Sequence, residues 1–250
     1  MKINKFILVS LLFATFSLTA CDLGRLISKA NNDDDDVSEN DGDKSKGGAG
    51  DNSGAQGGDN YDDSIFDKPE SLKKFMDFGK NTGFEITTKA TSSDGTDSDV
   101  LFAMKGNTWW MIDDTGYGTG YRLDGGKCAM LSYDDTSNSW SVLIADVGES
   151  QYEAMFESLS GYLYKANNDF ANDGFAYEGN MQYAGRNTMK FKYSRSVATV
   201  SIKHDYYVDS ELGISLYEYA ETSSDGEKEW AKLETTSFKT GNGVTPITVA

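Results

Sequence analysis

Few residues of this 250-residue chain have a type and spacing that could support catalysis. The single histidine, His204, lies in a strand-like stretch between two charged neighbours, where an imidazole is more often a surface residue than a catalyst. Two acid pairs, Asp113-Asp114 and Asp134-Asp135, precede turn-like stretches, where aspartate commonly accepts hydrogen bonds from the backbone. The sequence has no Gly-x-Ser-x-Gly or His-Glu-x-x-His motif and no cysteine cluster. It therefore predicts a protein that is not an enzyme and holds neither a metal ion nor a cofactor.

The adjacent tryptophans Trp109 and Trp110 are a second group that could take part in binding. Neighbouring side chains of a strand point to opposite faces, so we expect one in the interior and the other against water or a helix. An exposed tryptophan can stack on a sugar ring, which keeps a glycan-binding surface open as an alternative to packing in the core.

The first twenty residues have the pattern of a secretory signal. A short basic start with Lys2 and Lys5 precedes the almost entirely apolar residues 6–18. At about 1.5 Å per residue, this run is too short for a finished helix to cross a hydrocarbon core of roughly 30 Å. We therefore expect residues 1–20 to be removed as a signal peptide.

Cys21 has the most specific chemical context in the chain. The sequence Leu18-Thr19-Ala20-Cys21 resembles the lipobox of bacterial lipoproteins. The resemblance implies that cleavage falls before Cys21, that its sulfur receives a diacylglyceryl group, and that the new amino end is acylated, for example with palmitate. Two or more acyl chains make a stable anchor, so the resemblance implies that the membrane is a partner through Cys21.

Residues 21–68 are predicted to be a disordered tether. They contain the run Asp33-Asp34-Asp35-Asp36 and many glycines, and they have too few apolar residues to build a core. The acidic run has no frame with the ligand spacing of an EF-hand, so we do not expect calcium binding. The net charge of −17 argues against nucleic acid as a partner.

The predicted location is the bacterial cell envelope, with a lipid anchor and with the outer membrane preferred to the inner one. In some bacteria an acidic run after the lipidated cysteine directs a lipoprotein to the cell surface. In others, an aspartate directly after that cysteine, as Asp22 is here, retains it at the inner membrane. These analogies conflict, so the leaflet is left open.

Residues 69–250 are predicted to form a single domain with two helices. Pro69 and Gly79 bound the first helix, whose apolar residues Leu72, Phe75 and Met76 share one face. The second helix, residues 149–166, has apolar side chains at helical spacing on one face. Those side chains are Tyr152, Met155, Phe156, Leu159, Tyr162 and Leu163.

The rest of this domain is rich in strand signals separated by short Gly, Asn and Asp turns. We therefore expect a mainly β (α+β) fold: a strongly curved antiparallel sheet or an open, incomplete β-barrel of about ten or eleven strands, with two helices on its concave side. The expected strands are residues 84–90, 100–105, 108–113, 117–123, 127–133, 139–145, 175–183, 186–193, 197–208, 214–222 and 229–238.

The last third of the chain resembles a known superfamily. Gly185-Arg186-Asn187-Thr188 opens a strand, a strand ending in Val208-Asp209 leads through a short turn into Gly213-Ile214, and a strand ending in Phe238 follows. This order is similar to that of the LolA/LolB/LppX-like periplasmic lipoprotein carriers. The sequence departs from them at Ile214-Ser215, where many members have Leu-Pro, and it has no match for their lid-locking arginine.

The resemblance implies an open β-barrel whose helix-covered concave side can hold acyl chains. We expect a non-catalytic, membrane-anchored binding lipoprotein with a lipid or acylated partner in an apolar cavity, and we expect it to be a monomer. The alternative is a surface-exposed glycan- or protein-binding module. Cys128 has no partner in the chain if Cys21 carries lipid, and an unpaired cysteine is most often buried. The expected cavity residues are Trp109, Trp110, Tyr152, Met155, Phe156, Leu159 and Leu163.

Overall fold

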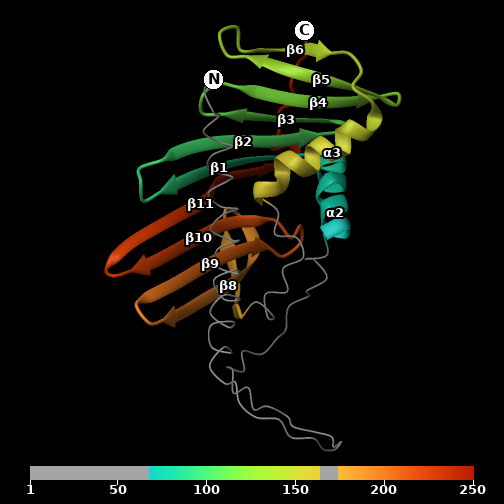
Figure 1. Ribbon diagram of the computed structural model, residues 1–250. Helices are drawn as coiled ribbons and strands as arrows, with labels where there is room; N and C mark the ends of the chain where they lie inside the picture. The colour runs from blue at the N-terminus through green and yellow to red at the C-terminus, as the bar shows by residue number, and fades with distance from the viewer. Residues whose placement is uncertain (1–67, 164–173) are drawn as a thin grey trace, which may run out of the picture.

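The computed structural model describes residues 68–163 and 174–250, which form one antiparallel sheet of eleven strands with two α-helices against it (Figure 1). The predictions of a signal peptide, a lipidated Cys21 and a tether fall on residues 1–67, outside the described residues, and stay predictions. The elements are α2 (Lys68–Asn81), β1 (Phe84–Ser92), β2 (Asp97–Lys105), β3 (Thr108–Asp113), β4 (Gly118–Asp124), β5 (Lys127–Asp134), β6 (Ser139–Ile144), α3 (Glu149–Ser160), η2 (Gly161–Leu163), β7 (Ala176–Tyr183), β8 (Arg186–Val197), β9 (Val200–Asp209), β10 (Ser215–Ser224), β11 (Glu227–Thr240) and η3 (Gly241–Gly243).

The sheet consists of two meanders joined in its middle. The strand order is β6-β5-β4-β3-β2-β1-β11-β10-β9-β8-β7, so β1 and β11, the first and last strands of the described residues, pair with each other. The edge strands β6 and β7 do not meet, and the sheet therefore stays open. The predicted fold class, a mainly β, curved and open antiparallel sheet with two helices, is confirmed.

Most hairpin turns lie where the glycines predicted them, but two differ in detail. Asp124 pairs with Lys127, so the expected three-residue loop is a two-residue loop of Gly125 and Gly126, both at positive φ (57° and 80°). Positive φ at both central residues is the geometry that matches the twist of a tight hairpin. The expected break at residues 194–196 is wrong: β8 continues to Val197, and the turn has Ala198 at φ 52°.

Both predicted helices are present on one face of the sheet, with one shorter than expected. The helix expected at residues 69–79 is α2, and the helix expected at residues 149–166 is α3, which ends at Ser160 before the 3₁₀ turn η2. Residues 164–166 lie outside the described residues. In Figure 1 the two helices lie next to each other on the same side of the sheet.

The sheet has an apolar cluster on each face. We call the helix-covered cluster the concave core; it includes Phe75 of α2, Phe84 of β1, Phe102 of β2, Trp109 of β3 and Phe156 of α3. The opposite cluster contains Trp110, Leu131 and Trp140 and is covered by the C-terminal residues, including the buried Val244. Because strand side chains alternate between faces, neighbouring residues of one strand supply both clusters.

Candidate functional site

The concave core is a continuous group of aromatic rings between the sheet and the helices. Phe75 stacks on Phe84 with their centroids 4.5 Å apart, and Phe156 lies 5.6 Å from Phe75 and 5.4 Å from Phe102. Trp109 follows at 6.0 Å from Phe156, with its ring nearly perpendicular. Offset and edge-to-face contacts at these distances are favourable for aromatic pairs. The helices are therefore attached to the sheet chiefly through aromatic contacts.

Six of the seven predicted cavity residues belong to this core. Tyr152, Phe156 and Leu163 are fully buried in it, and Met155 and Leu159 are half-buried beside them. Trp109, from the middle of the sheet, is also fully buried. The helical spacing thus correctly grouped these residues on one face, although it could not show which strands they would meet.

Trp110 does not join the group. Its side chain, 3% exposed, lies on the opposite face with Leu131 and Trp140. There the chain end covers it: Val249 forms a parallel bridge with Trp140, and the Ala250 N–H donates to the Trp140 carbonyl oxygen at 2.9 Å. The expectation that the second tryptophan faces water or a helix is wrong, because the C-terminal residues, which carried no strand signal, shield it. Neither tryptophan is exposed enough to stack on a sugar.

Two polar groups inside the concave core stand out because they are donors without acceptors. Within the described part of the chain, the Trp109 Nε1–H and the Tyr152 O–H are buried and make no hydrogen bond. The two rings lie 6.4 Å apart. Burial raises the pKa of the Tyr152 hydroxyl well above its ordinary value, and the nearby Cys128 and Glu153 add to the effect. Tyr152 therefore stays a neutral hydroxyl that can donate a hydrogen bond to an acceptor.

Cys128 lies in the same region and is a buried free thiol, as expected of an unpaired cysteine. Burial raises its pKa, and the charge of Asp146 raises it further. A raised pKa keeps the sulfur in the thiol form, which is a poor nucleophile. We therefore assign Cys128 to packing in the concave core.

The single histidine is buried, which the sequence did not predict. His204 is 4% exposed and lies among the rings of Phe175, Tyr193 and Tyr206. The Tyr206 hydroxyl donates to the buried Glu218 carboxylate at 2.9 Å. The charged neighbours of His204 suggested a surface position. Side chains alternate between the two faces of a strand, so His204 shares a face with Tyr206. That spacing was the sequence signal that could have indicated its burial.

The first aspartate of each acid pair, Asp113 and Asp134, has the predicted capping role. Asp113 Oδ1 accepts hydrogen bonds from the Thr115 and Tyr117 N–H groups, both at 3.0 Å. Asp134 accepts from the Thr136 N–H and the Ser137 hydroxyl. The Ser137 hydrogen bond, with help from Thr136, lowers the pKa of Asp134. One aspartate of each pair thus accepts hydrogen bonds within a hairpin turn.

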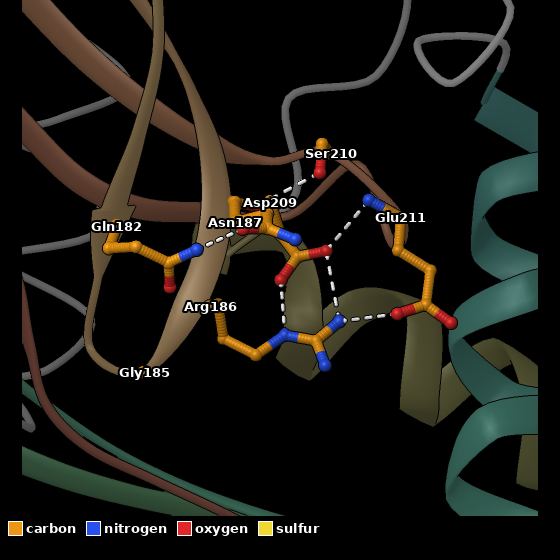
Figure 2. Close-up of a pocket in the computed structure, with 7 residues that line it drawn as sticks. All are labelled: Gln182, Gly185, Arg186, Asn187, Asp209, Ser210 and Glu211. Atoms are coloured by element: carbon orange, nitrogen blue, oxygen red, sulfur yellow. Dashed lines mark hydrogen bonds and ion pairs between the residues drawn. The ribbon is translucent and has the colours of Figure 1, made fainter.

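A separate polar pocket lies where β8 begins and β9 ends (Figure 2). Its volume is about 310 Å³. The turns between β7 and β8 and between β9 and β10 bring its residues together, and Figure 2 shows Arg186 pointing towards Asp209 and Glu211 across it. The lining residues are Gln182, Gly185, Arg186, Asn187, Asp209, Ser210 and Glu211.

Arg186 is the charged residue of this pocket that makes contacts with both acidic side chains of the lining. Its Nε donates to Asp209 Oδ2 at 2.6 Å and its Nη2 to Glu211 Oε2 at 2.8 Å. The guanidinium also lies over two rings, 5.6 Å from the centroid of Phe78 of α2 and 5.2 Å from that of Phe238 of β11. Burial alone would lower the pKa of Arg186, but the hydrogen bonds and charges of Asp209 and Glu211 outweigh it and raise that pKa.

Some kinds of site are missing from the parts of the chain that the structure describes. In residues 68–163 and 174–250, no three His, Cys, Asp or Glu side chains gather as metal ligands would. Over the same residues, no helix combines the length and the apolar character needed to cross a bilayer.

Comparisons with known proteins found likeness only in structure. No protein-family model and no curated protein sequence matches the chain. Among solved structures, PNGF-II matches with a TM-score of 0.25 and 12% identity over 68% of this chain, and the chain spans 31% of PNGF-II.

Two further structures are matched over almost their whole length. A Vibrio parahaemolyticus domain described as an outer membrane lipoprotein-sorting protein domain has a TM-score of 0.22 and 7% identity, covering 71% of this chain and 94% of its own. A DUF1329 family protein from Desulfovibrio piger ATCC 29098 has a TM-score of 0.25 and 9% identity over the same shares. The structural neighbours thus include a domain described as lipoprotein-sorting.

Proposed function

We propose that this protein is a membrane-anchored, non-catalytic binding lipoprotein of the bacterial envelope, which holds a lipid or an acylated partner against the concave core. Lipid on Cys21 would supply the anchor, and residues 22–67 would set the distance between the bilayer and the domain. The curved sheet supplies a large aromatic surface, and the helices supply a cover. Such a surface suits acyl chains, because their transfer from water to apolar surroundings is favourable without any directional contact.

The observation that carries the proposal is the pair of donors without acceptors, Trp109 Nε1–H and Tyr152 O–H. A buried donor that loses its water partner costs about 1–3 kcal/mol, and native proteins satisfy most such groups. A ligand that brings an oxygen acceptor between these two groups would recover that cost. Acyl esters, amides and carboxyl groups all combine such an oxygen with an apolar chain, so they match the site in both respects.

The attachment of α3 supports a role for this helix as a movable cover. Its buried side chains are Tyr152, Phe156 and Ser160, all on one narrow stripe. Glycines flank it on both sides, Gly148 at φ 88° and Gly161. Glycine tolerates backbone angles that other residues resist, so these two positions can absorb a change in the helix direction. A ligand could enter beneath α3 without disturbing the hydrogen bonds between the strands of the sheet.

Replacing Tyr152 by phenylalanine separates ligand binding from stability. In the ligand-free protein the change removes a buried hydroxyl without a partner, so we expect the urea midpoint to stay the same or to rise. Binding of a fluorescent fatty acid should weaken by about fivefold, since one hydrogen bond to the ligand is lost. Tyr133→Phe is the control, because that hydroxyl bonds Asn138 on the outside of the sheet. Equal fatty-acid affinity in the parent protein and the Tyr152 variant, or no binding by the parent, would overturn the proposal.

A further inference from the structure

The polar pocket differs from the concave core in the chemistry that it offers to a ligand. Its lining side chains combine two amides, a hydroxyl, a guanidinium and two carboxylates. Among the described residues, Gln182 Oε1, Asn187 Nδ2 and Arg186 Nη1 have hydrogen-bonding capacity that the protein itself does not use. The pocket therefore presents both donors and acceptors at close range, which suits a ligand carrying several hydroxyl groups.

The charge balance of the pocket disfavours an anion. Arg186 is the only cation in its lining, and it is already paired with Asp209 and with Glu211. Two carboxylates against one guanidinium leave the pocket with a slight negative charge. A phosphate or carboxylate would have to compete with both acids for Arg186, whereas a neutral ligand would not.

The pocket is also built rigidly enough to select a ligand. The Asp209 side chain is 1% exposed, and its Oδ1 accepts from the N–H groups of Glu211 and Leu212 at 2.9 and 2.8 Å. The Ser210 N–H and hydroxyl both donate to the Asn187 carbonyl oxygen, at 3.0 and 3.1 Å, which ties the two turns together. Preorganised polar groups bind with a smaller loss of conformational entropy than mobile ones. Glu211, 67% exposed, lies at the open side.

We propose that this pocket binds a neutral sugar unit, either free or as the head group of a glycolipid. Each hydroxyl of a pyranose can both donate and accept a hydrogen bond, so it can pair with amide, carboxylate and guanidinium groups. A volume of about 310 Å³ is at the lower end for ligand sites and fits one sugar unit and not a chain of several. The pocket is distinct from the concave core, so this site does not depend on the binding of acyl chains.

The experiment uses the full chain purified from its membrane in a detergent without a sugar head group. Saturation-transfer NMR would be recorded with D-glucose, D-mannose, D-galactose, N-acetyl-D-glucosamine and L-rhamnose. We expect at least one sugar to give a signal, and its affinity to fall by about fivefold or more in Gln182→Leu and in Asn187→Ala, because each removes a hydrogen-bonding side chain. Gln151→Leu, the same change on the exposed side of α3, is the matched control and should leave the affinity unchanged.

The source of the sugar is decided by comparing a methyl glycoside with the corresponding glycolipid. Equal affinities would identify a free sugar, and tighter binding of the glycolipid that weakens in Gln182→Leu would identify a head group; both results support the pocket. The proposal is overturned by no signal from any sugar or glycolipid. It is equally overturned by affinities that do not change in either pocket variant, or by inorganic phosphate displacing the sugar. Fatty-acid binding, measured separately, is unaffected by any of these outcomes.

Discussion

Asp209 shows how one buried side chain can organise a whole corner of the sheet. It closes the turn between β9 and β10 through its Oδ1 and holds Arg186 through both oxygens. Arg186 in turn contacts Phe78 of α2 and Phe238 of β11. A carboxylate buried to this degree is stable only because each oxygen has a hydrogen-bond partner.

The buried pair of Arg186 and Asp209 should therefore matter far more to stability than the exposed pair with Glu211. We expect Asp209→Asn to lower the free energy of unfolding by about 3–5 kcal/mol, because it leaves a partly buried guanidinium without its main counter-charge. Glu211→Gln, at a position 67% exposed, should cost at most about 1 kcal/mol. Urea unfolding of both variants tests this, and equal losses would show that burial does not set the strength of the pair.

Glu221 gives a prediction about acid. Hydrogen bonds from Tyr219 and Lys203 lower its pKa, so its carboxylate is favoured in the folded state. A carboxylate whose pKa is lower in the folded state stabilises the fold at pH values above its pKa in the unfolded state, which is about 4.3 for glutamate. This stabilisation is lost as the pH falls through the pKa of the folded state. The difference in unfolding free energy between the parent protein and Glu221→Gln should therefore stay constant above about pH 5 and shrink as the pH falls below that value. A difference that stays constant below that value as well would contradict the assignment.

At the scale of elements, α3 is the helix for which we make predictions about both stability and the proposed ligand binding. Phe156 connects it to α2, β2 and β3 through three ring contacts, whereas Leu159 is only half-buried. The helix is therefore held through its buried stripe of Tyr152, Phe156 and Ser160, while Leu159 lies at the margin of that stripe.

Phe156→Ala should cost about 3–5 kcal/mol in unfolding free energy, because the space that the ring fills among its three aromatic neighbours becomes a void. Leu159→Ala should cost clearly less, since part of this side chain already faces solvent. If α3 covers a ligand, Leu159→Ala should change fatty-acid affinity by a larger factor than it changes the folding equilibrium. Urea midpoints and fluorescence titrations of the two variants measure both quantities, and parallel changes in the two would assign α3 to packing alone.

The elements show clearly which features the sequence can predict. Short turns with glycine at positive φ, such as Gly125-Gly126, are local events, and their positions were foreseen to within one residue. The turn at Ala198 was missed because it has no glycine or asparagine, and the polar stretch at residues 194–196 gave a false turn signal within β8. The burial of Trp110 was missed for a different reason: its cover, Val244 and Val249, comes from a distant part of the chain.

The two candidate sites also differ in how far the sequence predicts them. Helical spacing identified Tyr152, Phe156 and Leu163 as one group, because that group lies within a single element. The polar pocket was not foreseen, because Gln182 and Ser210 come together only when two turns are placed side by side by the sheet. A pocket assembled from separate turns leaves no spacing in the sequence to detect.

At the scale of the whole molecule, the proposed role needs the domain to be attached to a membrane. Cys21→Ser should abolish labelling by a fatty-acid analogue and move the protein out of the membrane fraction. The change lies outside the described residues, so the folded domain should keep its urea midpoint. Normal labelling of the variant would disprove the lipobox assignment without bearing on the concave core.

The central claim, that the concave core holds an acyl ligand, is tested most directly by mass spectrometry of the full chain isolated natively from its own membrane. After washing with lipid-free detergent, the parent protein should retain a lipid or acylated molecule in near-stoichiometric amount. Tyr152→Phe should retain several-fold less, since it lacks one of the two buried donors that we propose the ligand satisfies. Parent protein that carries no more lipid than Tyr152→Phe, or none beyond the acyl chains on Cys21, would contradict the account.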